Sequence, residues 1–93
     1  MYVSDSATIV VSKEQVSSHL GDEAAILSLK NGVYYGLNPV GARVWNLIQE
    51  PRTFAELHSV LAGEYDVDGP RLEADLRHLI GQLADQRLVE ISG

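Results

Sequence analysis

The sequence contains no cysteine among its 93 residues. Disulfide bonds, thiolate metal sites and a cysteine nucleophile are therefore excluded. No apolar run approaches the roughly 20 residues that cross a bilayer. The N-terminal residues Met1 to Asp5 also lack the basic and apolar regions of a signal peptide. These absences predict a protein without a membrane segment, and we expect it in the cytoplasm.

Positive charge is scarce as well. Seven Lys and Arg residues face thirteen Asp and Glu residues, which gives a formal net charge of -6. A charge of this sign repels phosphate backbones and anionic membrane surfaces within a Debye length of about 8 Å. Neither nucleic acid nor a membrane is therefore an expected partner, and a cationic or neutral partner suits the chain better.

The length of the chain points to a single folding unit. With 93 residues it is too short for two independent hydrophobic cores, and its apolar share of 45% is ordinary for a globular protein. The sequence also has no linker, internal repeat or low-complexity tract. We therefore expect residues 1–93 to form one domain.

The first third of the sequence is typical of β-structure. Residues 8–11 are a short β-branched run, and a polar stretch follows them. Two further apolar runs, residues 25–29 and 33–37, flank Asn31-Gly32. An Asn-Gly pair between two such runs indicates a β-hairpin, because both residues accept a positive φ. The sequence thus predicts three strands, of which residues 33–37 are the third.

From Asn38 onward the apolar period changes from two to about 3.6 residues. Asn38 is a suitable N-cap and Pro39 suits the first helical position, so a helix of about ten residues is expected to follow. Pro51 is expected to stop it. One stripe of this helix should face the core: Val40, Val44, Trp45 and Ile48.

Thr53 and Glu56 have the spacing of a capping box that starts a second helix. Gly63 is expected to end this helix in a left-handed cap. Three apolar residues should form its buried face: Phe54, Leu57 and Leu61.

The third predicted helix is the longest and opens at residues 68–70, with a pattern sustained for about four turns. Its apolar side consists of Leu72, Leu76, Leu79, Ile80 and Leu83. Residues 88–91 form either a last short strand or an extended tail. Three strands followed by three helices describe an α+β fold, winged helix-turn-helix-like, with a β-hairpin docked on a trihelical core.

Three segments carry a resemblance to a known family: residues 21–29, 31–38 and 41–48. Their order of strand, Asn-Gly turn, aromatic strand, Asn-Pro and helix resembles the PqqD-like peptide chaperone of pyrroloquinoline quinone biosynthesis. The chain is similar in particular to the stand-alone leader-recognition subunit of split leader peptidases in lasso-peptide biosynthesis. The resemblance extends over nearly the whole sequence, from about residue 9 to residue 89.

The resemblance implies a non-catalytic recognition element, without a cofactor, for the leader of a ribosomally made precursor peptide. It implies that the leader adds as a strand beside the third strand and lies in a groove closed by the third helix. The implied partners are a separate cysteine protease subunit and an ATP-dependent macrolactam synthetase. The matching segments give these peptide-binding residues: Val33, Tyr34, Tyr35, Gly36, Leu37, Leu72, Asp75, Leu76 and Leu79.

The residues of the third strand fit such a role on physical grounds. An edge strand leaves N–H and C=O groups unpaired, and an extended peptide pairs with them by β-augmentation. Gly36 lacks a side chain and permits the close approach of another backbone or of the third helix, but a bulge or a packing notch explains it equally well. Tyr34 and Tyr35 point to opposite faces, so one belongs to the core while the other is free for a partner, or both are structural.

Residues 64–75 concentrate acidic side chains around the start of the third helix: Glu64, Asp66, Asp68, Glu73 and Asp75. They form a solvated capping region or complement a basic leader. Their spacing also resembles an EF-hand calcium loop, but the first position is Glu and the last is Asp, which reaches less far. The histidines lie in three different elements without a second ligand, so no metal site and no catalytic residue is predicted.

Two other classes of protein share this pattern. A winged helix-turn-helix regulator would place the third helix in the major groove of DNA, but Glu73 and Asp75 at its start argue against phosphate and base contacts. An assembly subunit would pair its edge strand with a second copy of itself. The leader-binding interpretation is preferred to both.

Overall fold

The computed structural model describes residues 3–93, so Met1 and Tyr2 of the N-terminal stretch lie outside the described residues. Four strands come first: β1 (Thr8–Val11), β2 (Gln15–Leu20), β3 (Glu23–Ser28) and β4 (Tyr34–Leu37). They are followed by α1 (Pro39–Leu47), β5 (Arg52–Thr53), α2 (Phe54–Glu64), α3 (Gly69–Asp85) and β6 (Val89–Ser92). No helix within residues 3–93 has the length and apolar character needed to cross a membrane.

The α+β class, with strands first and then three helices, is confirmed. The structure has more strands than the three expected, because the polar stretch after Val11 forms β2 and a two-residue β5 precedes α2. β2 pairs with β3 along its whole length, from Gln15↔Ser28 to Leu20↔Glu23. Main-chain pairing rather than an apolar face therefore holds this strand in place.

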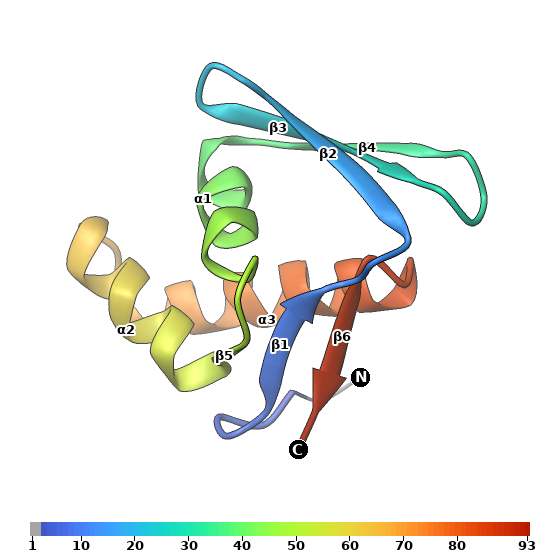
Figure 1. The fold of residues 1–93 in the computed structure, drawn as a ribbon. Coiled ribbons are helices and arrows are strands. Elements are labelled where there is room, and N and C mark those ends of the chain that lie inside the picture. Colours follow the sequence, from blue (N-terminus) through green and yellow to red (C-terminus); the bar gives the residue numbers. More distant parts are fainter. Residues whose placement is uncertain (1–2) are drawn as a thin grey trace.

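The strands form two separate antiparallel sheets that lie against the helices (Figure 1). One has the order β5-β1-β6 and brings the first and last strands of the chain together; the undecided residues 88–91 thus contribute to a strand. The other has the order β2-β3-β4, with β3 in the centre and β4 at an edge. Figure 1 shows this second sheet crossing the top of the molecule, with α1 beneath it and α3 running along the opposite side of the helical layer.

The hairpin predicted around Asn31-Gly32 is formed by β3 and β4. Gly32 has a φ of 70°, but Asn31 does not have a positive φ. Its Oδ1 instead accepts a hydrogen bond from the N–H of Val33 at 3.0 Å. Asn31 thus does not use the positive φ that it could accept, and its side chain bonds within the loop between β3 and β4 instead.

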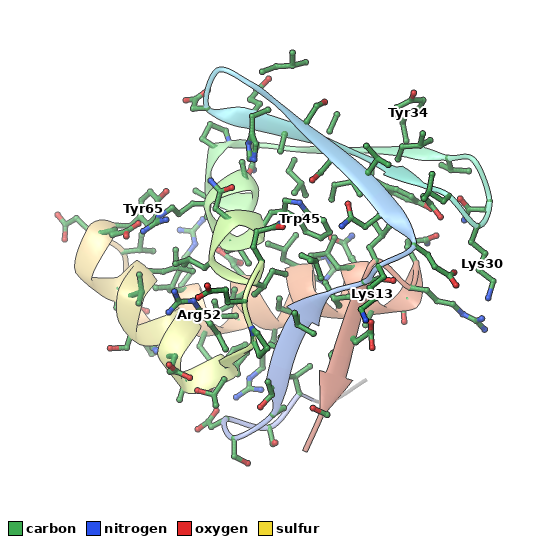
Figure 2. All side chains as sticks on the ribbon, viewed as in Figure 1. Lys13, Lys30, Tyr34, Trp45, Arg52 and Tyr65 are labelled. Atoms are coloured by element: carbon green, nitrogen blue, oxygen red, sulfur yellow. The ribbon has the colours of Figure 1, made fainter. Side chains whose placement is uncertain are left out.

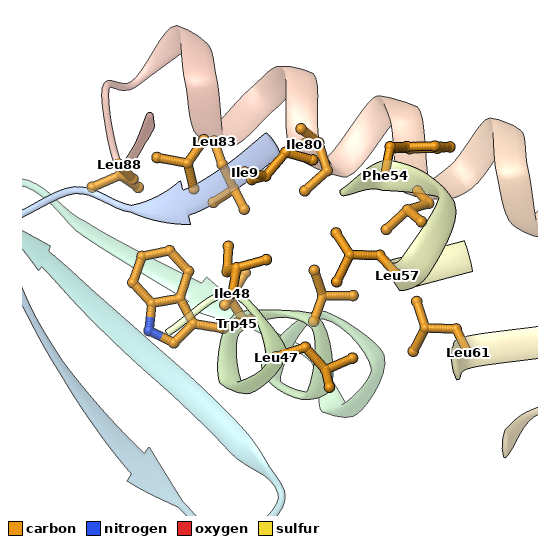
Figure 3. Packing of buried hydrophobic residues seen from close by; sticks show 14 of the residues in the cluster. Ile9, Trp45, Leu47, Ile48, Phe54, Leu57, Leu61, Ile80, Leu83 and Leu88 are labelled. Carbon is orange, nitrogen blue, oxygen red and sulfur yellow. The ribbon is translucent and has the colours of Figure 1, made fainter. Parts of the chain in front are cut away.

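The core lies between the helices and the two sheets (Figure 3). Its fully buried side chains, each with 0% exposure, come from both sheets and all three helices: Ile9, Ile26, Val44, Trp45, Ile48, Leu57, Leu61 and Ile80. Val40 was expected in the same stripe of α1 but is 39% exposed. Its position in the first turn of α1 places it beside a surface groove rather than in the core.

All three predicted helix starts are confirmed, and α3 begins at Gly69 as expected. Asn38 Oδ1 accepts a hydrogen bond from the N–H of Gly41 at 2.8 Å and caps α1. Thr53 and Glu56 form the capping box of α2. The Glu56 carboxylate accepts the N–H of Thr53 at 3.0 Å, and this hydrogen bond lowers the pKa of Glu56.

The predicted end of α2 is wrong. Gly63 lies inside the helix without a positive φ, and α2 continues to Glu64. The guanidinium of Arg43 binds both carboxylate oxygens of Glu64, with contacts of 2.9 Å and 2.7 Å, and lowers the pKa of that carboxyl group. This contact between α1 and α2 stabilises the last turn, which local sequence does not predict.

The C-terminal end of α3 is closed by a Schellman motif. The N–H of Arg87 donates to Ala84 O at 3.0 Å, and the N–H of Leu88 donates to Leu83 O at 2.9 Å. Arg87 occupies the left-handed position of this motif with a φ of 58°. Glycine is the usual residue at such a position, because an L-residue there brings Cβ close to a carbonyl oxygen.

Replacing Arg87 by glycine should therefore stabilise the fold. We expect Arg87→Gly to raise the free energy of unfolding by about 0.5–1 kcal/mol, because relief of the left-handed strain exceeds the added entropy of the unfolded chain. Thermal unfolding followed by circular dichroism should show a midpoint about 2–6 °C higher. The control is Arg71→Gly, which removes the same charge from the first turns of α3 and should lower the midpoint. A lower midpoint for Arg87→Gly as well would contradict the prediction.

Candidate functional site

Within residues 3–93, the outer edge of β4 has no neighbouring strand. The N–H of Ser28 donates to Val33 O at 3.0 Å, so these two residues form a hydrogen-bonded pair at the start of the ladder. Hydrogen-bonded and non-hydrogen-bonded pairs alternate in an antiparallel ladder, so Tyr35 bonds to β3 while Tyr34 and Gly36 direct their N–H and C=O groups outwards. The free edge therefore presents the main-chain groups of these two residues to an extended chain.

A groove of about 970 Å³ lies between this edge and α3. Its first wall is β4, its second wall is one face of α3, and the start of α1 joins the two through Asn38, Val40 and Gly41. In Figure 1, β4 lies above α3, and the two elements run in opposite directions. A peptide strand placed beside β4 would therefore also face α3.

Most of the predicted peptide-binding residues line this groove: Tyr34, Tyr35, Gly36, Leu37, Asp75 and Leu79. Val33 lies in the loop before β4, is 45% exposed and is not part of the lining. Leu72 and Leu76 are buried in the core and do not reach the groove either. They belong to the apolar stripe of α3 that faces the core, whereas a neighbouring face of the same helix lines the groove.

Leu72 and Leu76 do contribute to a smaller apolar pocket of about 140 Å³. It lies among α1, the end of α2 and the first half of α3, and Tyr65 and Val67 of the α2–α3 loop border it. Val40, Asp75 and Leu79 line both this pocket and the groove. The groove thus has an apolar extension at the N-terminal half of α3.

The predicted peptide-binding residues did not include the other groove residues, among them four polar residues of α3 and its C-cap: His78, Gln82, Asp85 and Gln86. With Asp75 and Leu79 they recur on one face of α3, three or four positions apart. The apolar stripe of α3, from which the predicted residues came, faces the core instead. The polar neighbours of half-buried Leu79 at helical spacing are the signal that would have located this wall.

The two tyrosines of β4 point to opposite faces, as expected. Tyr34 is 71% exposed and points away from the helices (Figure 2). Tyr35 is half-buried, packs against the core, and donates its hydroxyl to Oε1 of Gln86 at 2.5 Å. Tyr34 therefore contributes its main chain to the edge, whereas Tyr35 spans the groove with its side chain.

The structure decides among the interpretations of Gly36. In the part of the chain that the structure describes, no atom would lie within 4 Å of a Cβ at Gly36, so this residue is neither a packing notch nor a point of close approach to α3. The strand register is uninterrupted from Leu27↔Tyr34 to Ala24↔Leu37, so it is not a bulge. The space beside it is open to a backbone from another chain.

The charge around the groove is negative. Among the residues of the 3–93 range that line it, Asp75 and Asp85 are acidic and none is Lys or Arg. Asp75 is 71% exposed, and its carboxylate lies 4.0 Å from Arg71, at the limit of an ion pair. Glu64, the first position of the EF-hand-like spacing, is paired with Arg43, and residues 3–93 contain no cluster of three potential metal ligands.

Known proteins resemble this chain in sequence and in fold. The family model described as coenzyme PQQ synthesis protein D (PqqD) matches residues 23–89. The solved structure of TbiB1 in complex with the TbiA(beta) leader peptide is 40% identical, has a TM-score of 0.82, and aligns over 87% of this chain and 94% of that chain. A comparison with curated proteins gave no significant match.

A second solved structure, lasso peptide synthetase B1 complexed with the leader peptide, has the same fold. Its TM-score is 0.77 at 20% identity, over 88% of this chain and 96% of that chain. The family match begins at the first residue of β3 and ends in β6, so it includes both walls of the groove. The chain belongs to the PqqD family.

Proposed function

We propose that this protein is a non-catalytic recognition domain that binds the leader segment of a ribosomally made precursor peptide in lasso-peptide biosynthesis. The observation that carries the proposal is the free edge of β4 facing α3 across an open groove. The two solved relatives described above were both determined with a leader peptide, which supports the same role here.

The leader would bind by β-augmentation. Its main chain pairs with the outward N–H and C=O groups of Tyr34 and Gly36, and its alternate side chains enter the groove towards α3. Main-chain hydrogen bonds supply affinity for any extended peptide. Specificity must then come from the side chains of α3 and from the apolar extension next to Leu79.

The acidic lining favours a leader with basic or neutral side chains. Asp75 and Asp85 lie ten positions apart on α3, which corresponds to about 15 Å along the helix axis. Four or five residues of an extended strand span about the same distance. A leader cation at either end of such a segment would meet a carboxylate, which increases the association rate and the specificity of binding.

The partners follow from this role. We infer that the domain acts in the cytoplasm and presents the bound precursor to a separate cysteine protease subunit, which removes the leader, and to an ATP-dependent macrolactam synthetase. Residues 1–93 would act as one binding domain without a cofactor. The groove leaves the outer face of the sheet, including the exposed side chain of Tyr34, free for such proteins.

Titration with a labelled cognate leader tests the proposal. Fluorescence polarisation should saturate with a Kd of roughly 10 nM to 10 μM, and mass spectrometry should find the precursor unchanged after incubation with the domain alone. A scrambled leader of the same composition is the control and should bind much more weakly. Absence of saturation at a hundredfold higher concentration would sink the proposal, and tight sequence-specific retention of duplex DNA would replace it by the winged-helix regulator.

A further inference from the structure

The two walls of the groove are joined by a side-chain hydrogen bond. The hydroxyl of Tyr35 in β4 donates to Oε1 of Gln86 at the C-terminal end of α3, with 2.5 Å between the oxygens. These residues are 51 positions apart in the sequence, and both belong to the lining of the groove. The contact therefore connects the strand that would pair with a leader to the helix that would face it.

Both ends of this hydrogen bond are held in place. On the strand side, Tyr35 pairs with Ile26 of β3, and its ring packs against the core. On the helix side, Gln86 is the C-cap of α3, and its N–H donates to Gln82 O at 3.2 Å. The Schellman motif at Arg87 then fixes the turn that follows. The hydrogen bond therefore joins two residues that are each anchored in their own element.

The main-chain pattern of β4 explains why Tyr35 can serve this purpose without obstructing a peptide. The N–H and C=O groups of Tyr35 point towards β3, whereas those of Tyr34 and Gly36 point to the open edge. The residue that bridges to α3 is thus not one that offers main-chain groups to the leader. The side-chain bond and the leader pairing are compatible in the same strand.

We propose that the Tyr35–Gln86 hydrogen bond is a strut that fixes the width of the groove and preorganises it for an extended peptide. This inference rests on the proposed leader-binding function and assigns Tyr35 and Gln86 as positioning residues. Without the strut, β4 keeps its pairing with β3 and the packing of Tyr35 and Leu37 against the core, but the edge strand and the end of α3 must be ordered relative to each other when the leader binds. That ordering cost reduces affinity.

The test is a double-mutant cycle on leader affinity. Tyr35→Phe removes the donor and keeps the ring, and Gln86→Met removes the acceptor and keeps the length of the side chain. Each single variant should weaken binding about fivefold, the effect of one ordinary hydrogen bond. The double variant should be no more than about tenfold weaker than the parent, because both changes break the same contact. The conservative variant Gln86→Glu keeps an acceptor for the hydroxyl and should bind within about twofold of the parent.

Two results would overturn the strut. Equal affinity of the parent and both single variants would show that the hydrogen bond is irrelevant to binding. A double variant about 25-fold weaker, the product of the single effects, would show that the two side chains contact the leader independently.

Amide hydrogen exchange of the free protein separates this inference from the proposed function. In Tyr35→Phe and Gln86→Met, the N–H groups of Tyr35 and Leu37, which bond to β3, should exchange about fivefold faster than in the parent. Those of the β2–β3 ladder should be unchanged, and Gln86→Glu should behave as the parent. If the parent binds no leader but exchange responds in this way, the proposed function fails and the strut stands. Unchanged exchange in both variants would rule out the strut whether or not the leader binds.

Discussion

Gly36→Pro is expected to weaken leader binding by about thirtyfold or more while the domain remains folded. Proline deletes the N–H of Gly36, which points to the open edge, and its ring occupies space that a paired backbone needs. An edge strand tolerates proline on its free side, and no atom lies within 4 Å of a Cβ at this position. Polarisation titrations and thermal unfolding of the same preparation measure the two effects.

Gly36→Ala is the matched control within β4, because alanine keeps the N–H and places its Cβ in open space. It should bind within about threefold of the parent, since one methyl group adds no hydrogen-bond loss. Tyr35→Pro gives the opposite pattern. It removes an N–H that bonds to Ile26 of β3 and should lower stability by about 1–3 kcal/mol.

A proline at the other edge of the sheet tests whether the site is on β4. The N–H of Leu29 donates to Glu14 O at 3.0 Å, and the alternation of pairs then directs the N–H of Ser17 to the free edge of β2. Ser17→Pro is therefore equivalent to Gly36→Pro but lies far from α3, and leader affinity should be unchanged. If Ser17→Pro prevents binding and Gly36→Pro does not, the leader adds to β2 instead.

The elements that could be predicted from the sequence are those fixed by neighbouring residues. Asn38 and Thr53 cap their helices through contacts three positions away, and Gly32 adopts the positive φ that its hairpin requires. β2 escaped prediction because most of its residues are exposed, so it has no apolar alternation, and pairing with β3 alone makes it a strand. The extension of α2 beyond Gly63 likewise depends on an ion pair with a residue 21 positions earlier.

In the candidate site, too, the features fixed by neighbouring residues could be predicted and those fixed by distant contacts could not. Residues of β4 were found because an aromatic strand after an Asn-Gly turn is a strong local pattern. The apolar period of α3 then located the helix but not its exposed face, so Leu72 and Leu76 were assigned to the groove although they are buried. Which face of α3 lies opposite β4 depends on packing between distant segments, and helical periodicity alone does not contain that information.

Leu79→Ala should reduce leader affinity by about thirtyfold, equivalent to about 2 kcal/mol, the value expected for a central apolar contact. Leu79 is half-buried and lines both the groove and its apolar extension, so a leader side chain in either space touches it. Truncation to alanine removes most of that contact surface. Leu20→Ala is the control: Leu20 is 71% exposed on β2, far from the groove, and its loss should leave leader affinity unchanged.

The effect on folding must be separated from the effect on binding, because Leu79 also packs against the core. Leu76 precedes Leu79 by about one helical turn and is only 3% exposed. Leu76→Ala should therefore lower the free energy of unfolding by the roughly 2–5 kcal/mol typical of a buried leucine. Leu79→Ala should cost less than this, since its side chain already has exposed surface. Denaturant unfolding of each variant gives the fraction of protein that is folded under the binding conditions. The measured leader affinity is then corrected for this fraction. After that correction Leu79→Ala should lose more leader affinity than Leu76→Ala, because Leu79 lines both the groove and its apolar extension whereas Leu76 lines the extension alone. The reverse order would place the apolar contact of the leader outside the groove.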